Sequence, residues 1–186
     1  SNAPFAVLHP YPKFRYKMWH EDGWIGLAQW FAGIGLRVVL SGSPDADECA
    51  YIAAIARNLP NALNLAGRLT LGGTSALLAR ASCYVGPDTS ITHMAAASGI
   101  PTIALFGPSD PLKWGPWPRQ HPAATEPWRR LGNQRQGNVL LIQGRGACVP
   151  CKFEGCRRHL ESASDCLLSL STRDVIEGVK SILPAS

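Results

Sequence analysis

The sequence has no run of the roughly 18 apolar residues that a membrane-spanning helix needs, and it shows no secretory signal. It also has no internal repeat and no low-complexity tract. Charged residues are sparse, at 17% of the 186 residues, whereas hydrophobic residues make up 46%. This balance excludes a disordered chain and predicts a folded protein, most simply of one domain.

Basic residues are in modest excess, with a formal net charge of +5 at pH 7. Much of the excess lies in residues 13–17 and 119–135. Neither stretch interleaves aromatic and basic residues in a recognisable RNA-binding pattern, so we expect no nucleic-acid partner. A phosphorylated ligand or an anionic lipid headgroup remains compatible with this charge.

The opening Ser1-Asn2-Ala3 is typical of the remnant of a cleaved expression tag and is left out of the fold prediction. It directly precedes an apolar run, which raises the hypothesis that a longer protein was cut at a domain boundary. We therefore expect residues 4–186 to form a single Rossmann-like domain.

Short β-rich runs alternate with segments of helical periodicity. Strands are predicted at 5–8, 37–40, 62–65, 83–85, 102–106 and 139–142, and helices at 22–32, 46–58, 74–81, 90–98 and 173–183. This alternation predicts the α/β class, with a parallel sheet covered by helices on both faces. Right-handed crossovers then place every strand-to-helix loop at one edge of the sheet, where ligands bind in such folds.

Two segments do not follow this alternation. Residues 108–138 are rich in proline and tryptophan and predict an irregular excursion, and residues 148–166 are rich in cysteine. Four thiols in this second segment could hold zinc, although their spacing fits no familiar zinc template, and oxidation to disulfides is the alternative. These thiols are Cys148, Cys151, Cys156 and Cys166; Cys49 and Cys83 are predicted to be separate buried thiols.

The most informative stretch joins a strand to a helix between Val85 and Ala97. A helix start presents free backbone N–H groups and a positive dipole end, which suit a diphosphate. Thr89 and Ser90 add hydroxyl groups, and His93, one turn into the helix, leans back toward the same place. The alternative is that Asp88, Thr89 or Ser90 only caps the helix and that His93 is an ordinary surface residue.

The longer pattern resembles glycosyltransferase family 9, which includes the ADP-heptose:lipopolysaccharide heptosyltransferases. The motifs that carry the resemblance are Gly86-x-Asp88-Thr89-x-x-x-His93-x-Ala95-Ala96, Gly99-Ile100-Pro101-Thr102, Phe106-Gly107-Pro108-Ser109-Asp110-Pro111 and Trp114-Gly115-Pro116, with Lys17-x-Trp19, Asp47-Glu48 and Leu65-x-Gly67 upstream. Together they cover most of residues 5–118.

The resemblance implies the C-terminal half of a two-domain B-type glycosyltransferase. In that family this half holds the nucleotide sugar, and the N-terminal half holds the acceptor and supplies a carboxylate base. The reaction inverts the configuration at the anomeric carbon of the transferred sugar. It needs no metal or other cofactor. For this chain the resemblance implies ADP-heptose as donor, lipopolysaccharide core as acceptor, no catalytic residue of its own and little activity alone. It also implies a cytoplasmic location, with contact to the inner face of the inner membrane possible.

The resemblance also assigns roles to individual residues. Asp88, Thr89 and His93 match the loop that binds the phosphates and the sugar, and Lys17 matches a basic residue near the diphosphate. Glu48, or its neighbour Asp47, matches an acid that holds the ribose hydroxyls. In place of Ser90 the family usually has glycine, so a side chain there can crowd the approach of backbone to phosphate.

Each of these residues can also be interpreted as having a structural role that involves no ligand. Lys17 fits a solvated loop charge, and Glu48 fits a residue that only complements its helix dipole. Asp110 is interpreted as a turn residue, and Trp19 and Trp24 as packing residues. For the whole chain, the alternatives are half of a nucleotide-sugar epimerase or hydrolase, and a non-catalytic module built around a metal-holding tail.

Overall fold

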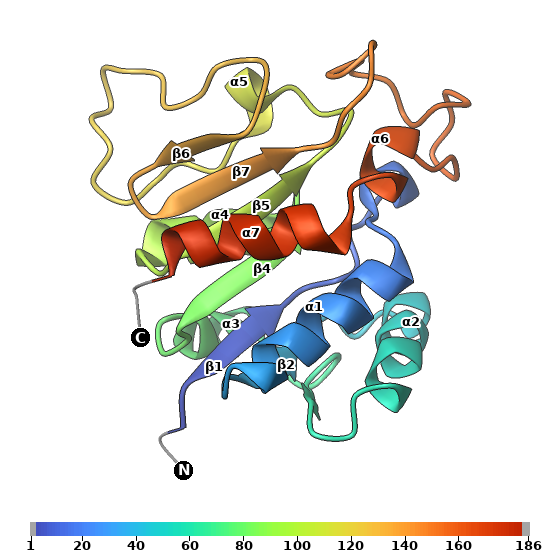
Figure 1. Ribbon diagram of the computed structural model, residues 1–186, viewed down its shortest axis with the longest axis vertical. Coiled ribbons are helices and arrows are strands. Elements are labelled where there is room, and N and C mark those ends of the chain that lie inside the picture. The colour runs from blue at the N-terminus through green and yellow to red at the C-terminus, as the bar shows by residue number, and fades with distance from the viewer. Residues whose placement is uncertain (1–2, 184–186) are drawn as a thin grey trace.

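The computed structural model describes residues 3–183, in which seven strands form one twisted sheet (Figure 1). The strands are β1 (Phe5–Leu8), β2 (Arg37–Leu40), β3 (Leu63–Asn64), β4 (Cys83–Pro87), β5 (Thr102–Phe106), β6 (Gln134–Gln136) and β7 (Val139–Gln143). Their spatial order is β3-β2-β1-β4-β5-β7-β6, and all neighbours are parallel except β6 and β7. The predicted α/β class with a parallel sheet is confirmed.

Helices cover both faces of this sheet (Figure 1). They are α1 (Glu21–Gly33), α2 (Ala46–Arg57), α3 (Leu71–Leu78), α4 (Ser90–Ser98), α5 (Pro111–Trp114), α6 (Asp165–Leu168) and α7 (Thr172–Ile182), with a short 3-10 helix at Arg15–Lys17. Helices α1, α2 and α7 pack on one face, and α3 and α4 on the other. No helix among residues 3–183 is both long and apolar enough to cross a bilayer.

The alternation of side chains along the strands explains these two layers. In β1, Ala6 and Leu8 belong to the core cluster that includes Trp24 and Phe31 of α1, whereas Val7 belongs to the opposite cluster. Successive side chains of a strand point to opposite faces, so a strand buried on both sides is apolar throughout. This is why the sequence shows continuous apolar runs at these strands.

The order of the strands places a crevice beside β1. From β1 the chain crosses to β2 on one side, and from β3 it returns through α3 to β4 on the other side of β1. The connections that leave β1 and β4 therefore diverge at their carboxyl ends. Ligands bind at such a switch point in open α/β sheets.

Most predicted elements are confirmed to within one or two residues at each end, and one helix is shifted further. The helix predicted at 74–81 is α3, which begins at Leu71 and ends at Leu78. It begins earlier because the Thr70 side chain accepts a hydrogen bond from the N–H of Gly73 at 3.1 Å and so caps a turn that contains two glycines. Glycine disfavours helix, so local preference alone does not place this turn in the helix.

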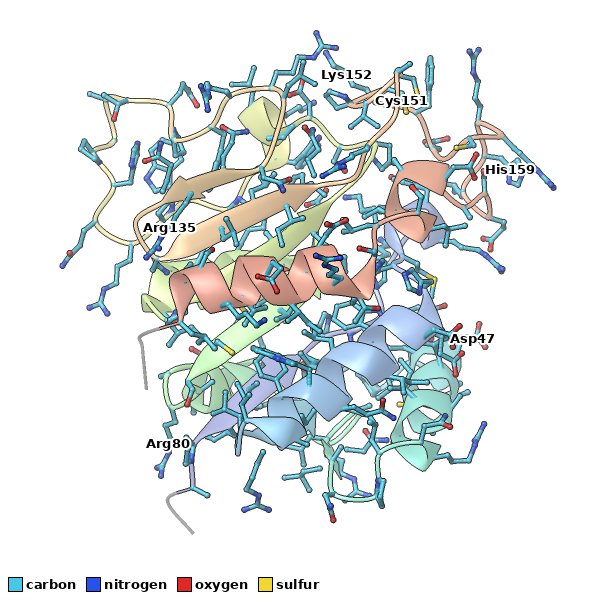
Figure 2. The ribbon with its side chains drawn as sticks, in the orientation of Figure 1. Asp47, Arg80, Arg135, Cys151, Lys152 and His159 are labelled. Carbon is cyan, nitrogen blue, oxygen red and sulfur yellow. The ribbon has the colours of Figure 1, made fainter. Side chains whose placement is uncertain are left out.

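The Pro-rich segment is less irregular than predicted, because it contains α5 and the edge strand β6. Asp110 caps α5 by accepting from the Leu112 N–H and pairs with Lys152 at 3.2 Å, so its prediction as a turn residue is confirmed. Arg135 of β6 reaches toward α7 (Figure 2) and donates to the Ser181 carbonyl at 2.7 Å.

The tail packs back onto the loop that follows β1. The Trp19 indole donates to the Leu170 carbonyl at 2.7 Å, and the Ser164 hydroxyl donates to the Tyr16 carbonyl at 2.7 Å. Trp19 and Trp24 are 1% and 0% exposed, which confirms that they are packing residues. The tag remnant predicted at residues 1–3 lies mostly outside the described residues.

Candidate functional site

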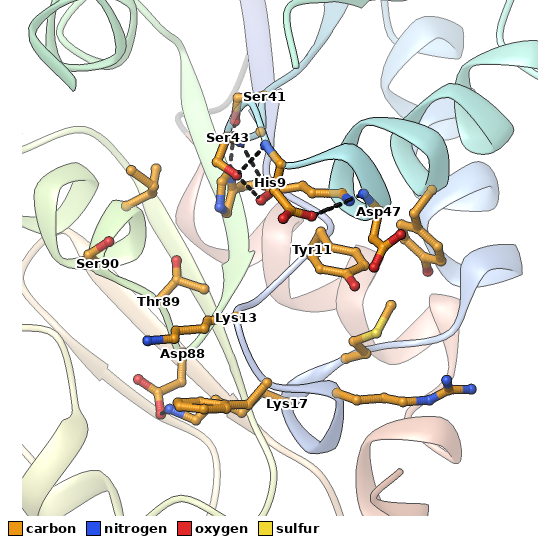
Figure 3. Close-up of a pocket in the computed structure, with 18 of the residues that line it drawn as sticks. His9, Tyr11, Lys13, Lys17, Ser41, Ser43, Asp47, Asp88, Thr89 and Ser90 are labelled. Atoms are coloured by element: carbon orange, nitrogen blue, oxygen red, sulfur yellow. Dashed lines mark hydrogen bonds and ion pairs between the residues drawn. The ribbon is translucent and has the colours of Figure 1, made fainter. Parts of the chain in front are cut away.

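A hollow of about 1420 Å³ lies at the carboxyl ends of β1, β2 and β4 (Figure 3). Three loops form most of its walls: the loop after β1 at residues 9–18, the loop after β2 with the start of α2, and the loop from β4 into α4. The rest of the lining comes from Leu69, Leu71, Thr74, Trp114, Leu160 and Glu161. All six residues predicted for the site lie in these walls. They are Lys17, Glu48, Asp88, Thr89, Ser90 and His93.

The β4–α4 loop presents a helix start to this hollow. Thr89 is the N-cap residue, with an extended backbone (φ −141°, ψ 165°), and its hydroxyl accepts a hydrogen bond from the Thr92 N–H at 3.4 Å. The N–H groups of Ser90 and Ile91 have no acceptor among residues 3–183. Thr89 therefore caps the helix, and two N–H donors remain free at a helix start that lines the hollow.

Buried contacts fix this loop from beneath. The Tyr84 hydroxyl lies 2.9 Å from the Thr92 hydroxyl, which in turn donates to the Pro87 carbonyl. A Cβ atom at Gly86 would lie only 2.1 Å from the Tyr84 hydroxyl, so Gly86 is required for the Tyr84 ring to fit. Burial raises the pKa of Tyr84 far above its usual value, and its hydrogen bonds to Thr92 and Thr89 oppose this, so Tyr84 stays a neutral hydroxyl.

Within the site, an ion pair joins the loop after β1 to the loop from β4 into α4. The Lys17 ammonium lies 2.6 Å from the Asp88 carboxylate, and their side chains are 16% and 6% exposed. The same ammonium lies 5.8 Å from the ring centroids of Phe14 and Trp114. Lys17 is therefore held in a shielded position, and its interpretation as a solvated loop charge is wrong.

His93 stands at the rim of the hollow, on the first turn of α4. Partial burial lowers the pKa of its imidazole; the Asp88 carboxylate opposes this shift and the Lys17 ammonium adds to it. His93 is nevertheless exposed on the surface, and the lowered pKa favours its neutral form at pH 7. A neutral imidazole has one donor and one acceptor nitrogen, so His93 can bind a hydroxyl or a phosphate oxygen without adding charge.

Acidic residues gather on the opposite wall, at the start of α2 (Figure 3). The buried Glu48 carboxylate accepts hydrogen bonds from the Ser43 N–H at 2.8 Å and from the Ser43 hydroxyl. Asp47 is exposed to the hollow. Glu48 therefore orders the β2–α2 loop, and either acid retains lone pairs for a ligand hydroxyl.

Sequence reasoning missed His9 and Ser41, which form the floor between these walls. His9 Nδ1 lies 3.1 Å from the Ser41 hydroxyl, and that hydroxyl is 3.3 Å from the Leu8 carbonyl, to which it donates. Burial lowers the pKa of His9 to about 4, and a hydrogen bond with the Ser41 backbone only partly opposes this shift. Both residues directly follow a predicted strand at the ligand edge, and that position was the signal that could have identified them.

Leu160 and Glu161 of the cysteine-rich tail (Figure 2) also line the hollow, whereas its four cysteines are not among the lining residues. Burial raises the pKa of Cys166 to about 11, and the nearby thiols of Cys151, Cys156 and Cys148 raise it further. All six cysteines are free, and no three potential ligands among residues 3–183 are arranged to hold a metal. Zinc in the tail thus remains a prediction. Cys83 is buried as predicted, but Cys49 is only half-buried, with its thiol 3.3 Å from the Ser43 carbonyl.

The model of glycosyltransferase family 9 (heptosyltransferase) matches residues 1–139 of this chain. The match covers more than half of the sequence and the three loops that form most of the site. The chain belongs to this family.

Curated relatives include lipopolysaccharide heptosyltransferase 3 of Escherichia coli, 32% identical over 115 residues, which are 61% of this chain and 34% of that protein. Lipopolysaccharide heptosyltransferase 1 of Pseudomonas aeruginosa is 37% identical over 109 residues, 59% of this chain and 30% of that protein. The alignments thus span about a third of the length of these relatives.

Solved structures show the same fold over nearly the whole chain. E. coli ADP-heptose lipopolysaccharide heptosyltransferase II aligns with a TM-score of 0.74 at 23% identity, covering 98% of this chain and 47% of that one. E. coli heptosyltransferase WaaC with ADP aligns with a TM-score of 0.70 at 21% identity. The alignment covers 97% of this chain and 45% of that one. This chain corresponds in length to about half of either structure.

Proposed function

We propose that this chain binds the nucleotide-sugar donor of an inverting heptosyltransferase that acts on lipopolysaccharide core. The free N–H groups of Ser90 and Ile91, which face the hollow at the switch point beside β1, carry the proposal. A helix start with free donors and a positive dipole end binds phosphate groups. A member of the family, WaaC, has been solved with ADP.

The distribution of charge in the hollow supports a nucleoside diphosphate. Lys13 and Lys17 line the end near α4, whereas Asp47 and Glu48 line the end near α2 (Figure 3). Phosphate oxygens would lie against the lysines and N–H groups, and ribose hydroxyls would donate to the acids. The volume of about 1420 Å³ exceeds the ~300–1,000 Å³ of typical ligand pockets, and so it suits a ligand as large as a nucleotide sugar.

The remaining side chains suit the sugar. Asp88 has acceptor oxygens beside the phosphate end, and the neutral His93 can donate to a sugar hydroxyl or to a phosphate oxygen. We assign no catalytic base to this chain. The base and the acceptor site belong, in this proposal, to a second domain of the enzyme.

The proposal therefore expects little sugar transfer by this chain alone, because the acceptor is not positioned and no base is supplied. It requires no metal or other cofactor for transfer. The full enzyme would act in the cytoplasm, at the inner face of the membrane where its lipid-linked acceptor is found.

Calorimetric titration of the chain with ADP, UDP and GDP tests the proposal, and we expect saturable binding of ADP. Ser90→Pro is the informative variant because proline removes one N–H donor yet suits the first position of a helix, and the extended Thr89 backbone tolerates a following proline. Loss of one hydrogen bond to a charged phosphate should weaken ADP binding about tenfold or more.

Ser90→Ala is the matched control, because it removes the hydroxyl and keeps the N–H. It should bind ADP within a few-fold of the original chain. Equal affinities of the proline and alanine variants for ADP would show that the helix start does not bind the phosphates, and absence of binding to all three nucleotides would overturn the proposed function.

A further inference from the structure

His9 and Ser41 lie at the floor of the hollow and are only 6% and 2% exposed. Each is the first residue after a strand, His9 after β1 and Ser41 after β2, and these strands pair in parallel. In Figure 3 the two residues lie between Asp47 at the start of α2 and Thr89 at the start of α4. A ligand that spans the hollow between these helix starts therefore passes over the His9 imidazole.

The contacts with Ser41 fix which nitrogen of this imidazole carries the proton. The Ser41 hydroxyl lies 3.3 Å from the Leu8 carbonyl, which can only accept, so the hydroxyl donates there. His9 Nδ1 lies 3.1 Å from the same hydroxyl oxygen and must then be the donor in that contact. A hydrogen bond with the Ser41 backbone raises the pKa of His9, as an acceptor does. Both contacts place the ring proton on Nδ1, the nitrogen that faces Ser41.

The other ring nitrogen, Nε2, is consequently a free acceptor. Burial lowers the pKa of His9 to about 4, so the imidazole is neutral at pH 7 and carries one proton only. Nε2 has no hydrogen-bond partner among residues 3–183, yet it is not closed off from solvent, as Trp24 Nε1 and Asp88 Oδ2 are. Because His9 lines the hollow, this lone pair opens into it. A nearly buried acceptor of this kind requires a donor from a ligand or from water.

The chemistry of Nε2 restricts the ligand group that it can bind. Its lone pair repels a phosphate oxygen and accepts from a hydroxyl, so it suits the uncharged part of a nucleotide. The loop after β2, which begins at Ser41, leads to Glu48 and Asp47 on the same side of the hollow. The proposed function places the ribose hydroxyls at that wall. The ribose is therefore the hydroxyl-bearing group next to His9.

We propose that His9, held by Ser41 with its proton on Nδ1, accepts a hydrogen bond from a ribose hydroxyl through Nε2. This inference rests on the proposed function, because it names a further contact within that site. The contact makes His9 a specificity-determining residue that favours a ribonucleotide over its deoxy analogue.

Nitrogen-15 NMR of the labelled chain tests the position of the proton without a variant. Protonated and unprotonated imidazole nitrogens differ widely in chemical shift, and at pH 7 we expect His9 Nε2 to show the unprotonated value. Saturating ADP should move this signal toward the protonated value, because Nε2 then accepts a hydrogen bond. A protonated Nε2 in the free chain would overturn the inference. If ADP binds and the Nε2 signal stays in place, only this inference fails; if no nucleotide binds, the proposed function fails as well.

Calorimetry with ADP, 2′-deoxy-ADP and 3′-deoxy-ADP identifies the hydroxyl. His9→Asn is the informative variant, because the Asn amide can donate to Ser41 as Nδ1 does but offers no acceptor at the position of Nε2. It should weaken ADP binding about three- to tenfold, whereas one of the two deoxy analogues should bind the variant and the original chain alike.

His159→Asn is the matched control, because His159 is exposed and does not line the hollow, and it should leave all three affinities unchanged. An equal loss for all three nucleotides in His9→Asn would show a general disturbance of the site and would overturn the inference. Unchanged ADP binding by His9→Asn would overturn it too.

Discussion

Lys17→Met is expected to lower the free energy of unfolding by about 3 kcal/mol, because it leaves the Asp88 carboxylate buried without its partner. Asp88 follows β4, whereas Lys17 ends the 3-10 helix that follows β1, so the pair joins the two loops that diverge at the switch point. For a chain of this length the loss corresponds to a fall in Tm of about 6–12 °C. Urea or thermal unfolding at pH 7 measures it directly.

The double variant Lys17→Met, Asp88→Asn separates a lost ion pair from lost packing. Both partners are then neutral, and an amide can bury its polar atoms at lower cost than a carboxylate. We expect its stability to return to within about 1 kcal/mol of the original chain. If the double variant is as unstable as Lys17→Met, the methylene packing of Lys17 and not its charge stabilises the loop.

The second large effect concerns pH. The pKa of His9 is lowered to about 4 in the folded chain from an ordinary value of 6.5. Between these two values the unfolded chain binds a proton that the folded chain does not, so the contribution of His9 to stability is full above pH 6.5 and is lost as pH falls toward 4. The shift corresponds to about 3 kcal/mol.

His9→Gln should remove this dependence, because the Gln amide can bond Ser41 without titrating. Urea unfolding at pH 7, 6, 5 and 4 should show the stability difference between the original chain and His9→Gln shifting by about 3 kcal/mol toward the variant as pH falls. His159→Gln is the control, since His159 is exposed. A difference that stays constant from pH 7 to pH 4 would mean that His9 protonates without cost in the folded chain.

The sequence predicted the loop from β4 into α4 well because its determinants are local. A buried strand, a threonine at the cap position and Gly99 at the end of the helix fix this unit within residues 83–99. The residues assigned to the site also lie in the hollow, and most elements differ from their predicted ends by only one or two residues. Helix α3 was the exception among the predicted elements, because the Thr70 cap extends it over two glycines, and α5, β6 and α6 were not predicted as separate elements.

The roles of single residues depended on contacts between distant parts of the chain. Nothing near Lys17 in the sequence shows that its charge is neutralised. Its partner Asp88 lies in the loop that follows β4, and only the parallel pairing of β1 with β4 brings the two residues together. His9 and Ser41 meet for the same reason, at the ends of β1 and β2.

The sequence by itself therefore determined the family, the alternation of strands and helices, and the helix start that faces the ligand edge, because periodicity and capping act over a few residues. Only the tertiary structure decided which charges in the hollow are paired and which imidazoles are neutral. Burial and ion pairing depend on atoms that the fold brings together from separate loops, and so they set the charge of the site only when the sheet is assembled.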